Sequence, residues 1–335
     1  MTGLRIAVLG ATGSVGEAIL SQLGDSTFAE CEVLALASRA ARVESVAMGE
    51  RTLPVRQLAD VHDLRPRLAF CALSPGIARQ VVPELVARGT FVIDVGNSTA
   101  GVVDAPLVLP AVRPPNPADL AAAGAARSPS AAGWLLATAL APLFRAGVAR
   151  VTGLVNLPAT AHGRAASAEL SEQVVASFNL KDPPRRIFAE GLAFDTLPED
   201  TPAGEWSERE GLAAAEVAEI LGVDPGRLGV QVVTQPIFAG ITAALYARGT
   251  VDASAAEELL RGSPGLASAA RSTLVRPRKV MGRTPVYWTG LRDDPANEGV
   301  HFWIAGDNLA GAGAAVPIAV AEAVLEAGLL SSLEA

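Results

Sequence analysis

The chain has 335 residues, half of them hydrophobic, with a mean hydropathy of +0.33 and a formal net charge of −8. This length and apolar content predict two domains with large buried cores, and the negative charge argues against nucleic acid or an anionic membrane surface as a partner. The first apolar run breaks at Gly10, no run approaches the ~20 residues of a membrane span, and two cysteines, Cys31 and Cys71, suit neither a disulfide framework nor a metal cage. We therefore expect a soluble, cytoplasmic protein without a metal site.

The first predicted elements enclose a glycine turn. The apolar run Leu4–Leu9 predicts a buried strand, glycines follow at 10, 13 and 16, and Val15–Leu23 has the pattern of an amphipathic helix. A strand, a glycine turn and a helix in this order place backbone N–H groups and a helix N-terminus against an anion such as a pyrophosphate. The spacing GxxGxxG is less specific than GxGxxG, and an ordinary glycine-rich turn is the alternative. The cofactor-binding residues predicted here are Gly10, Thr12, Gly13, Ser14 and Val15.

The end of the second strand indicates which dinucleotide would bind. Val33–Ala37 is followed by Ser38 and Arg39, with Arg42 three residues further on. An NAD-selective site usually carries Asp or Glu at this point, whereas a hydroxyl and a guanidinium suit a 2′-phosphate. We therefore predict NADP as the cofactor, with NAD as a possibility and a solvated loop arginine as the alternative interpretation.

The following segments continue the alternation of strands and helices. We expect strands at Leu68–Leu73 and Phe91–Val95, a helix at Ile77–Arg88, a short strand at Leu107–Leu109, and a short helix at Ala118–Arg127. This alternation predicts a Rossmann-like, doubly wound parallel sheet, in which ligands bind beyond the carboxyl ends of the strands. The residues expected on that edge are Gly10, Ser38, Ser74 and Asn97.

The second half changes to a strand-dominated pattern, which predicts an α+β domain with a mostly antiparallel sheet. A final helix is expected to begin at Asp307 and to run to about Ala327. The predicted domains are residues 1–130, joined by the C-terminal helix 307–335, and residues 131–306. Helices are expected at Ala131–Ala146, His162–Phe178 and Gly211–Leu221, strands at Val148–Asn156, Leu228–Val233, Ile241–Ala247, Val286–Leu291 and Val300–Ala305, and an irregular segment at Lys181–Trp206.

Seven short pieces in this order resemble the aspartate-semialdehyde dehydrogenase family over nearly the whole chain. They are the glycine turn 10–16, Ala37-Ser38-Arg39, Val92-Ile93-Asp94, 107–112 (LVLPAV), 139–143 (ALAPL), 169–173 (ELSEQ) and Asp307-Asn308-Leu309. The acyl-phosphate reductase of arginine synthesis is a less good match. The resemblance implies a dinucleotide-binding domain and a dimerisation domain, NADP as cofactor, and a small-molecule ligand in the crevice between the domains. It also implies a homodimer formed through the second sheet, a role in amino-acid biosynthesis, and a place for Asn308 near the nicotinamide.

The family's chemistry requires groups that this chain lacks at the matching positions. A cysteine thiolate attacks the aldehyde, a histidine assists, and arginines hold the anionic parts of the substrates. Ala131 takes the cysteine position, Ile241 the histidine position and Thr234 the position of a substrate arginine. Leu157 stands where a glutamine would orient the thioester, and no arginine follows shortly after Asp94. We therefore assign no catalytic residue.

Two interpretations remain. The chain resembles the family's Usg branch, which lacks the thiol, and would then keep the fold and the dinucleotide site without the chemistry. Alternatively, it is an active NADP-dependent semialdehyde dehydrogenase with displaced residues, for which Ser130, Cys71 and His162 are the candidates. Each of these three residues also has a simpler interpretation. Ser130 would cap a helix, Cys71 would be a small buried hydrophobic residue, and His162 would have a capping or surface role. Cys31, His62 and His301 are expected to be structural.

Overall fold

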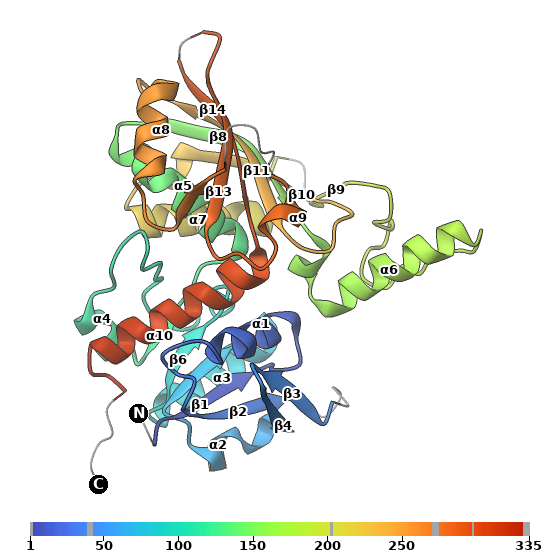
Figure 1. Cartoon of the computed structure of the whole chain (residues 1–335), viewed down its shortest axis with the longest axis vertical. Coiled ribbons are helices and arrows are strands. Elements are labelled where there is room, and N and C mark those ends of the chain that lie inside the picture. Colours follow the sequence, from blue (N-terminus) through green and yellow to red (C-terminus); the bar gives the residue numbers. More distant parts are fainter. Residues whose placement is uncertain (1–2, 39–42, 202–203, 270–274, 297, 331–335) are drawn as a thin grey trace. The chain divides into compact units, whose positions relative to one another are not determined.

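The computed structural model describes residues 3–38, 43–201, 204–269, 275–296 and 298–330 (Figure 1). The chain forms two compact units. Unit 1 comprises Met1–Ser130 and Ala312–Ala335, and unit 2 comprises Ala131–Gly311. The C-terminal segment thus returns to the unit that the N-terminal half builds, and the division falls within the last helix.

Unit 1 contains the predicted doubly wound sheet, whose strand order is β3-β4-β2-β1-β5-β6-β7. All neighbours are parallel except β3 and β4, which form an antiparallel pair. The Rossmann-like architecture expected from the sequence is confirmed. The strands are β1 (Arg5–Leu9), β2 (Glu32–Ala37), β3 (Ser45–Met48), β4 (Arg51–Gln57), β5 (Leu68–Cys71), β6 (Phe91–Asp94) and β7 (Ala125–Arg127).

Helices cover both faces of this sheet because successive residues of β1 point to opposite sides. Ile6 and Val8 pack with side chains of α1 (Ser14–Leu23) and α10 (Val316–Glu326), while Ala7 and Leu9 pack with α3 (Pro75–Ala87). Two further helices are α2 (Val61–Leu64) and α4 (Pro117–Ala123). The central strands are therefore apolar on both faces, as a buried parallel sheet requires.

Two expectations for unit 1 were wrong. Leu107–Leu109 is not a strand but contributes isolated bridges only, and the helix expected over Ala118–Arg127 ends at Ala123. Gly124 closes α4 in the left-handed conformation at φ +60°, and the following residues extend beside β6 as β7. The antiparallel pair β3–β4 was not predicted. Such short strands depend on their neighbours, which the sequence pattern does not reveal.

Unit 2 contains the second predicted sheet, with the strand order β12-β13-β14-β11-β8-β10-β9. Its neighbours are antiparallel except for the pairs β12–β13 and β8–β10, so the mostly antiparallel sheet is confirmed. The strands are β8 (Arg150–Leu157), β9 (Leu197–Pro198), β10 (Leu228–Thr234), β11 (Ile241–Arg248), β12 (Leu266–Ser268), β13 (Val286–Asp293) and β14 (Gly299–Gly306).

Helix α5 (Ala131–Arg145) is the central helix of unit 2 and is buried over nearly its whole length. It packs on α7 (Glu208–Leu221), where a Cβ at Gly133 would lie 1.9 Å from Oε2 of the buried Glu216. The glycine therefore permits this close helix contact. The remaining helices are α6 (Arg164–Phe178), α8 (Ala253–Arg261) and α9 (Pro277–Val280), of which α8 and α9 were not predicted.

The last helix runs without a break over Asn308–Glu326, with π-helical geometry up to Ala315. Its length and mean hydropathy of 1.5 would allow it to cross a membrane, but 61% of the apolar window is buried within the protein, as in a core helix. The start of this helix approaches α5 closely. A Cβ at Gly311, in this helix, would lie 2.4 Å from the ring of Trp134 on α5. A Cβ at Gly306, at the end of β14, would lie 2.5 Å from the same ring.

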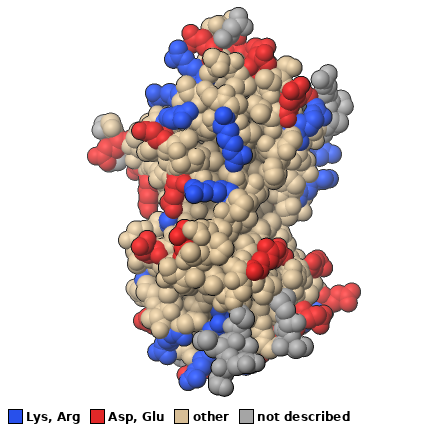
Figure 2. Space-filling model, turned by 90° about the vertical axis from the view of Figure 1, so that its left-hand side faces the viewer, with Lys and Arg blue, Asp and Glu red and all other residues tan. Residues whose placement is uncertain are grey.

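Charged side chains of both signs are interspersed on the face that Figure 2 draws. No continuous basic stripe appears on that face, in keeping with the net charge of −8.

Candidate functional site

The residues predicted to face a dinucleotide lie along one edge of the unit 1 sheet. Gly10 follows β1, Ser38 follows β2, Ser74 follows β5 and Asn97 follows β6. The register pairs the last residue of β1 with Leu36 and Cys71, so the ends of these parallel strands are level. Ser38 and Ser74 are exposed, while Arg39 and Arg42 lie outside the described residues.

The glycine turn has a conformation that other residues would not adopt without strain. Gly10 has φ +83°, and a Cβ there would lie 2.4 Å from the carbonyl oxygen of Ala72. A Cβ at Gly16 would lie 2.2 Å from the Gly10 carbonyl oxygen. Gly13 is the N-cap of α1 and has no side chain with which to cap the first turn of the helix. Thr12, Ser14 and Val15 are partly buried around this turn.

Asp94 organises the loop that follows β6. It is 1% exposed and accepts hydrogen bonds from the hydroxyls of Ser98 and Thr99 and, at 2.8 Å, from the Thr99 amide. Burial raises the pKa of Asp94, while these hydrogen bonds lower it and only partly offset the burial. Asn97 has φ +59° and its Oδ1 accepts from Nη1 of Arg127 at 2.9 Å. Asp94 therefore fixes the loop and is not free to act on a ligand.

Three unit 2 residues that the resemblance matched to the family's functional positions lie at one end of the second sheet. Thr234, at the end of β10, pairs with Leu157 at the end of β8, and Ile241 begins β11 on the other side of β8. Ile241 is 0% exposed, Thr234 2% and Leu157 4%. The fold thus brings together three residues that are separated along the sequence. None of the three carries a group that titrates near neutral pH.

Side-chain amides link the strands at this end of the sheet. Nδ2 of Asn156 donates to Oγ1 of Thr242 at 3.1 Å, and Nε2 of Gln235 donates to Oδ1 of Asn156 at 2.9 Å. Oδ1 of Asn308 accepts from the Gly240 amide at 2.9 Å, and its Nδ2 donates to Oγ1 of Thr160 at 3.1 Å. Asn308 therefore holds the residue that precedes Ile241.

His162 lies beside Thr234 in a fixed tautomer. Arg209 Nη2 approaches Nδ1 of His162 at 3.2 Å, and because a guanidinium only donates, Nδ1 must accept. The ring hydrogen is then on Nε2, which donates to Oγ1 of Thr234 at 2.8 Å. Burial lowers the pKa of His162 to about 4, with a further contribution from the positive charge of Arg209. At neutral pH His162 is a neutral donor toward Thr234 and cannot accept its proton.

Arg209 is the functional candidate that sequence reasoning missed. Its Nη1 forms an ion pair with Glu199 at 2.9 Å. The N-cap Ser207 and Glu210 form a capping box that fixes the first turn of α7 and hence places Arg209 toward His162. The pattern Ser-x-x-Glu was the available signal, because it predicts that α7 begins at this point and not at Gly211.

The other candidate nucleophiles and bases have structural surroundings. Cys71 is 0% exposed, and burial, followed by the charge of Asp94, raises the pKa of its thiol to about 12, so it is not a thiolate at neutral pH. Cys31 is also buried. His301 contacts Asp294 at 2.9 Å and stacks on a tyrosine, and Ser130 directly precedes α5. Among the described residues, no group of three or more His, Cys, Asp or Glu side chains could hold a metal ion.

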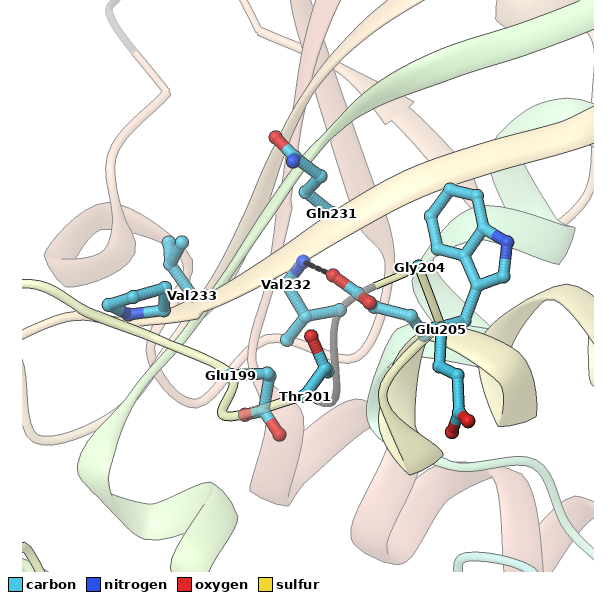
Figure 3. Close-up of a pocket in the computed structure, with 10 residues that line it drawn as sticks. Glu199, Thr201, Gly204, Glu205, Gln231, Val232 and Val233 are labelled. Carbon is cyan, nitrogen blue, oxygen red and sulfur yellow. Dashed lines mark hydrogen bonds between the residues drawn. The ribbon is translucent and has the colours of Figure 1, made fainter.

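A cavity of about 450 Å³ lies beside the outer strands β9 and β10 of unit 2 (Figure 3). Its walls include Glu199, Glu205, Glu210 and the exposed Trp206. Glu199 is paired with Arg209, and Glu210 accepts from the amides of Ser207 and, at 3.0 Å, of Val232. Two of the three carboxylates are therefore engaged in structure, and the described lining contains no thiol or imidazole.

Comparison with known proteins agrees with this architecture. Residues 5–121 match the NAD binding domain of semialdehyde dehydrogenase, and residues 140–310 match its dimerisation domain. An aspartate-semialdehyde dehydrogenase from Rickettsia bellii is 27% identical, with 96% of this chain and 98% of that protein aligned. A USG-1 protein homolog from Azotobacter vinelandii is 29% identical, with 97% and 98% aligned.

A solved structure extends the similarity to three dimensions. The structure of a probable aspartate-semialdehyde dehydrogenase from Pseudomonas aeruginosa superposes with a TM-score of 0.87 at 26% identity, covering 96% of this chain and 98% of that chain. The resemblance noted from the seven sequence pieces is thereby confirmed. Because these two domain models together match most of its length, the chain belongs to the semialdehyde dehydrogenase family.

Proposed function

We propose that this chain is a cytoplasmic, homodimeric, NADP-binding member of the aspartate-semialdehyde dehydrogenase family that has lost the acyl-thioester chemistry, as in the Usg branch. The observation that carries the proposal is the end of the unit 2 sheet. Ile241 is fully buried there without a titratable group, and the neighbouring imidazole of His162 is committed to Arg209 and Thr234. A general base needs a free lone pair within reach of the proton that it removes. Neither position supplies one.

The missing groups serve successive requirements. Ala131 offers a methyl group where an ionisable thiol would attack the aldehyde. Thr234 stands in place of an arginine, so a charge-assisted hydrogen bond to the substrate, worth about 1.5–3 kcal/mol, is lost. A single substitution cannot supply nucleophile, base and anion contact together. We therefore expect no recovery of activity from Ala131→Cys alone.

The activity test measures NADPH formation from aspartate semialdehyde, NADP and phosphate with purified protein. We expect no detectable turnover by the unmodified chain or by Ala131→Cys, and partial recovery only when Ile241→His and Thr234→Arg are added. Calorimetric binding of NADP by each variant serves as the control, because it separates lost chemistry from lost cofactor binding. Robust turnover by the unmodified chain would refute the proposal.

The second candidate function is an active NADP-dependent semialdehyde dehydrogenase with displaced residues. The observation in its favour is the 2.8 Å contact between His162 and the Thr234 hydroxyl, which pairs an imidazole with an alcohol. The direction of the hydrogen bond opposes it, since Nε2 donates to the hydroxyl. If turnover is observed, loss of activity in Thr234→Val would support this candidate, and unchanged activity would redirect attention to Ser130.

The cofactor proposal places the pyrophosphate at Gly10, Thr12, Gly13, Ser14 and Val15, and the 2′-phosphate at Ser38 and Arg39, with Ser74 on the same edge. Titration with both dinucleotides tests it. We expect NADP to bind more than about tenfold more tightly than NAD, because one charge-assisted phosphate contact is worth at least about 1.5 kcal/mol. The variant Ser38→Asp should reduce this preference by repelling the 2′-phosphate. Equal affinities in the unmodified chain would overturn the assignment.

The homodimer proposal rests on the face of the unit 2 sheet opposite α5 and α8. Trp303, Ala244, Leu154 and Gln231 form a row of direct register partners across β14, β11, β8 and β10 on that face. Trp303, Ala244 and Leu154 make most of this row apolar and partly exposed, which suits a two-fold, self-complementary contact. We expect light scattering to give a dimer, and Ala244→Glu to give monomers. Ile77, an exposed apolar residue on α3, provides the control, and the variant Ile77→Glu should remain dimeric.

A further inference from the structure

Helix α6 and the loop that follows it, residues 164–196, form an arm on unit 2. Helix α5 packs against α7 and α8, and all three contact strands of the second sheet. Helix α6 instead contacts the short helical turn Ala159–His162 that precedes it. Figure 1 shows α6 extending beyond β9 and β10, away from the strands.

The end of α6 carries an apolar patch. Its members are Val175, Phe178, Leu180 and Phe194, with exposed fractions of 57%, 78%, 96% and 68%. Val175 and Phe178 lie one turn apart on α6, and the ring of Phe178 meets that of Phe194 edge to face, with 5.9 Å between the centroids. Two aromatic rings of about 150–250 Å² each, exposed to this extent beside a valine and a leucine, leave roughly 500 Å² of apolar surface in water. Exposed patches of this size are often interaction sites.

Buried polar side chains of α6 hold the patch in place. Gln173 is 1% exposed, and its Oε1 accepts from the amides of Leu192 and Ala193 at 2.7 Å and 3.0 Å. Glu169 is 0% exposed and accepts from the three amides of residues 186–188. Phe194 directly follows this clamped segment, so its ring is held beside Phe178. The patch is therefore a preformed surface.

Two members of the patch have a backbone conformation that disfavours bulky side chains. Leu180 has φ +53° and Phe194 has φ +66°. Glycine and asparagine are the usual residues there, because a larger side chain crowds the backbone. Strain of this kind is concentrated at functional positions. An exposed leucine and an exposed phenylalanine at such positions favour an interaction over a purely structural role.

The location of the patch indicates its partner. Only two residues separate Phe194 from β9, which pairs with β10 at the edge of the second sheet. The row of register partners on the open face of that sheet ends on β10, at Gln231. The patch thus continues from the face assigned to the homodimer, within the segment that matches a dimerisation domain. A standard interface buries about 800 Å² per partner, so the patch is too small to hold a separate protein but can extend a larger contact.

We propose that the arm reaches to the second copy of this chain and that the apolar patch packs against it. This inference rests on the proposed homodimer. Removal of the patch from water in the dimer then offsets the strain at Leu180 and Phe194.

The first test compares dimer dissociation constants, measured by light scattering on dilution of the full-length protein. The double variant Leu180→Asn/Phe194→Asn removes two apolar side chains, and Asn suits the left-handed backbone at both positions. We expect at least a tenfold weaker dimer. Hydrogen-exchange protection at residues 186–188 should stay unchanged, because the clamp from Glu169 is intact. The control Ile77→Asn removes an exposed isoleucine of unit 1 and should dimerise as the unmodified chain does.

The second test places a photo-crosslinking amino acid at position 178. Irradiation of the dimer should give covalently linked pairs of chains, whereas the same amino acid at position 77 should give none. If the double variant loses protection at 186–188, the cross-link alone decides. A dimer whose affinity is unchanged in a protected double variant, or which gives no cross-link from position 178, would overturn the inference and leave the homodimer proposal intact. A monomeric unmodified chain would overturn both.

Discussion

His162 makes unit 2 sensitive to acid in a way that one substitution can remove. In the folded chain the imidazole is neutral, accepts from Arg209 and donates to Thr234. Protonation would place a second positive charge beside the guanidinium in a partly buried site. The variant His162→Gln keeps an accepting oxygen and a donating nitrogen but cannot titrate.

The size of the effect follows from the difference in pKa between the two states. Burial and Arg209 lower the pKa of His162 from its ordinary 6.5 to about 4 in the folded chain. Between these values the unfolded chain binds a proton that the folded chain does not, so stability is complete above pH 6.5 and is lost as the pH falls toward 4. The loss amounts to about 2 kcal/mol between pH 7 and pH 5, and this is an upper limit because solvent screens a partly buried ring.

The assay is urea unfolding at pH 7 and at pH 5, with the unmodified chain, His162→Gln and the control His301→Gln. The unmodified chain and the control should lose up to about 2 kcal/mol more than His162→Gln over this interval. Titration of the His162 ring protons by NMR measures the same pKa directly. An equal pH dependence in all three proteins, or a folded-state pKa near 6.5, would refute the reasoning from Arg209 and burial.

Two further predictions concern packing and buried hydrogen bonds. Gly16→Ala should destabilise unit 1 by about 3 kcal/mol or more in thermal unfolding, because the new Cβ would lie 2.2 Å from a backbone oxygen. The control Gly76→Ala on α3 should be neutral or stabilising, because its Cβ would meet nothing within 4 Å. Glu169→Ala should cost about 2–4 kcal/mol and should expose residues 186–188 to hydrogen exchange, because the buried carboxylate accepts their three amides at 2.8–3.0 Å. Protection at 186–188 equal to that of the unmodified chain would contradict the second prediction.

Local sequence was sufficient for the larger elements and for the identity of the family. The run from Ile6 to Gly16 predicts a strand, a turn and a helix because apolar periodicity and glycine spacing act within a few residues of one another. The same local logic identified the antiparallel second sheet. The resemblance also led to the prediction that Ala131, Thr234 and Ile241 stand at the family's catalytic positions, since an alignment in order along the chain needs no three-dimensional information.

Tertiary structure alone decided which side chains meet. Short strands such as β7 and β3 form only because a neighbouring strand supplies hydrogen-bond partners, and their sequences have no periodicity long enough to predict them. The tautomer of His162 depends on Arg209, 47 residues away along the chain. Long-range hydrogen bonds and close glycine contacts of this kind leave no regular mark on the sequence, because their partners are brought together only when the two sheets and their helices have packed.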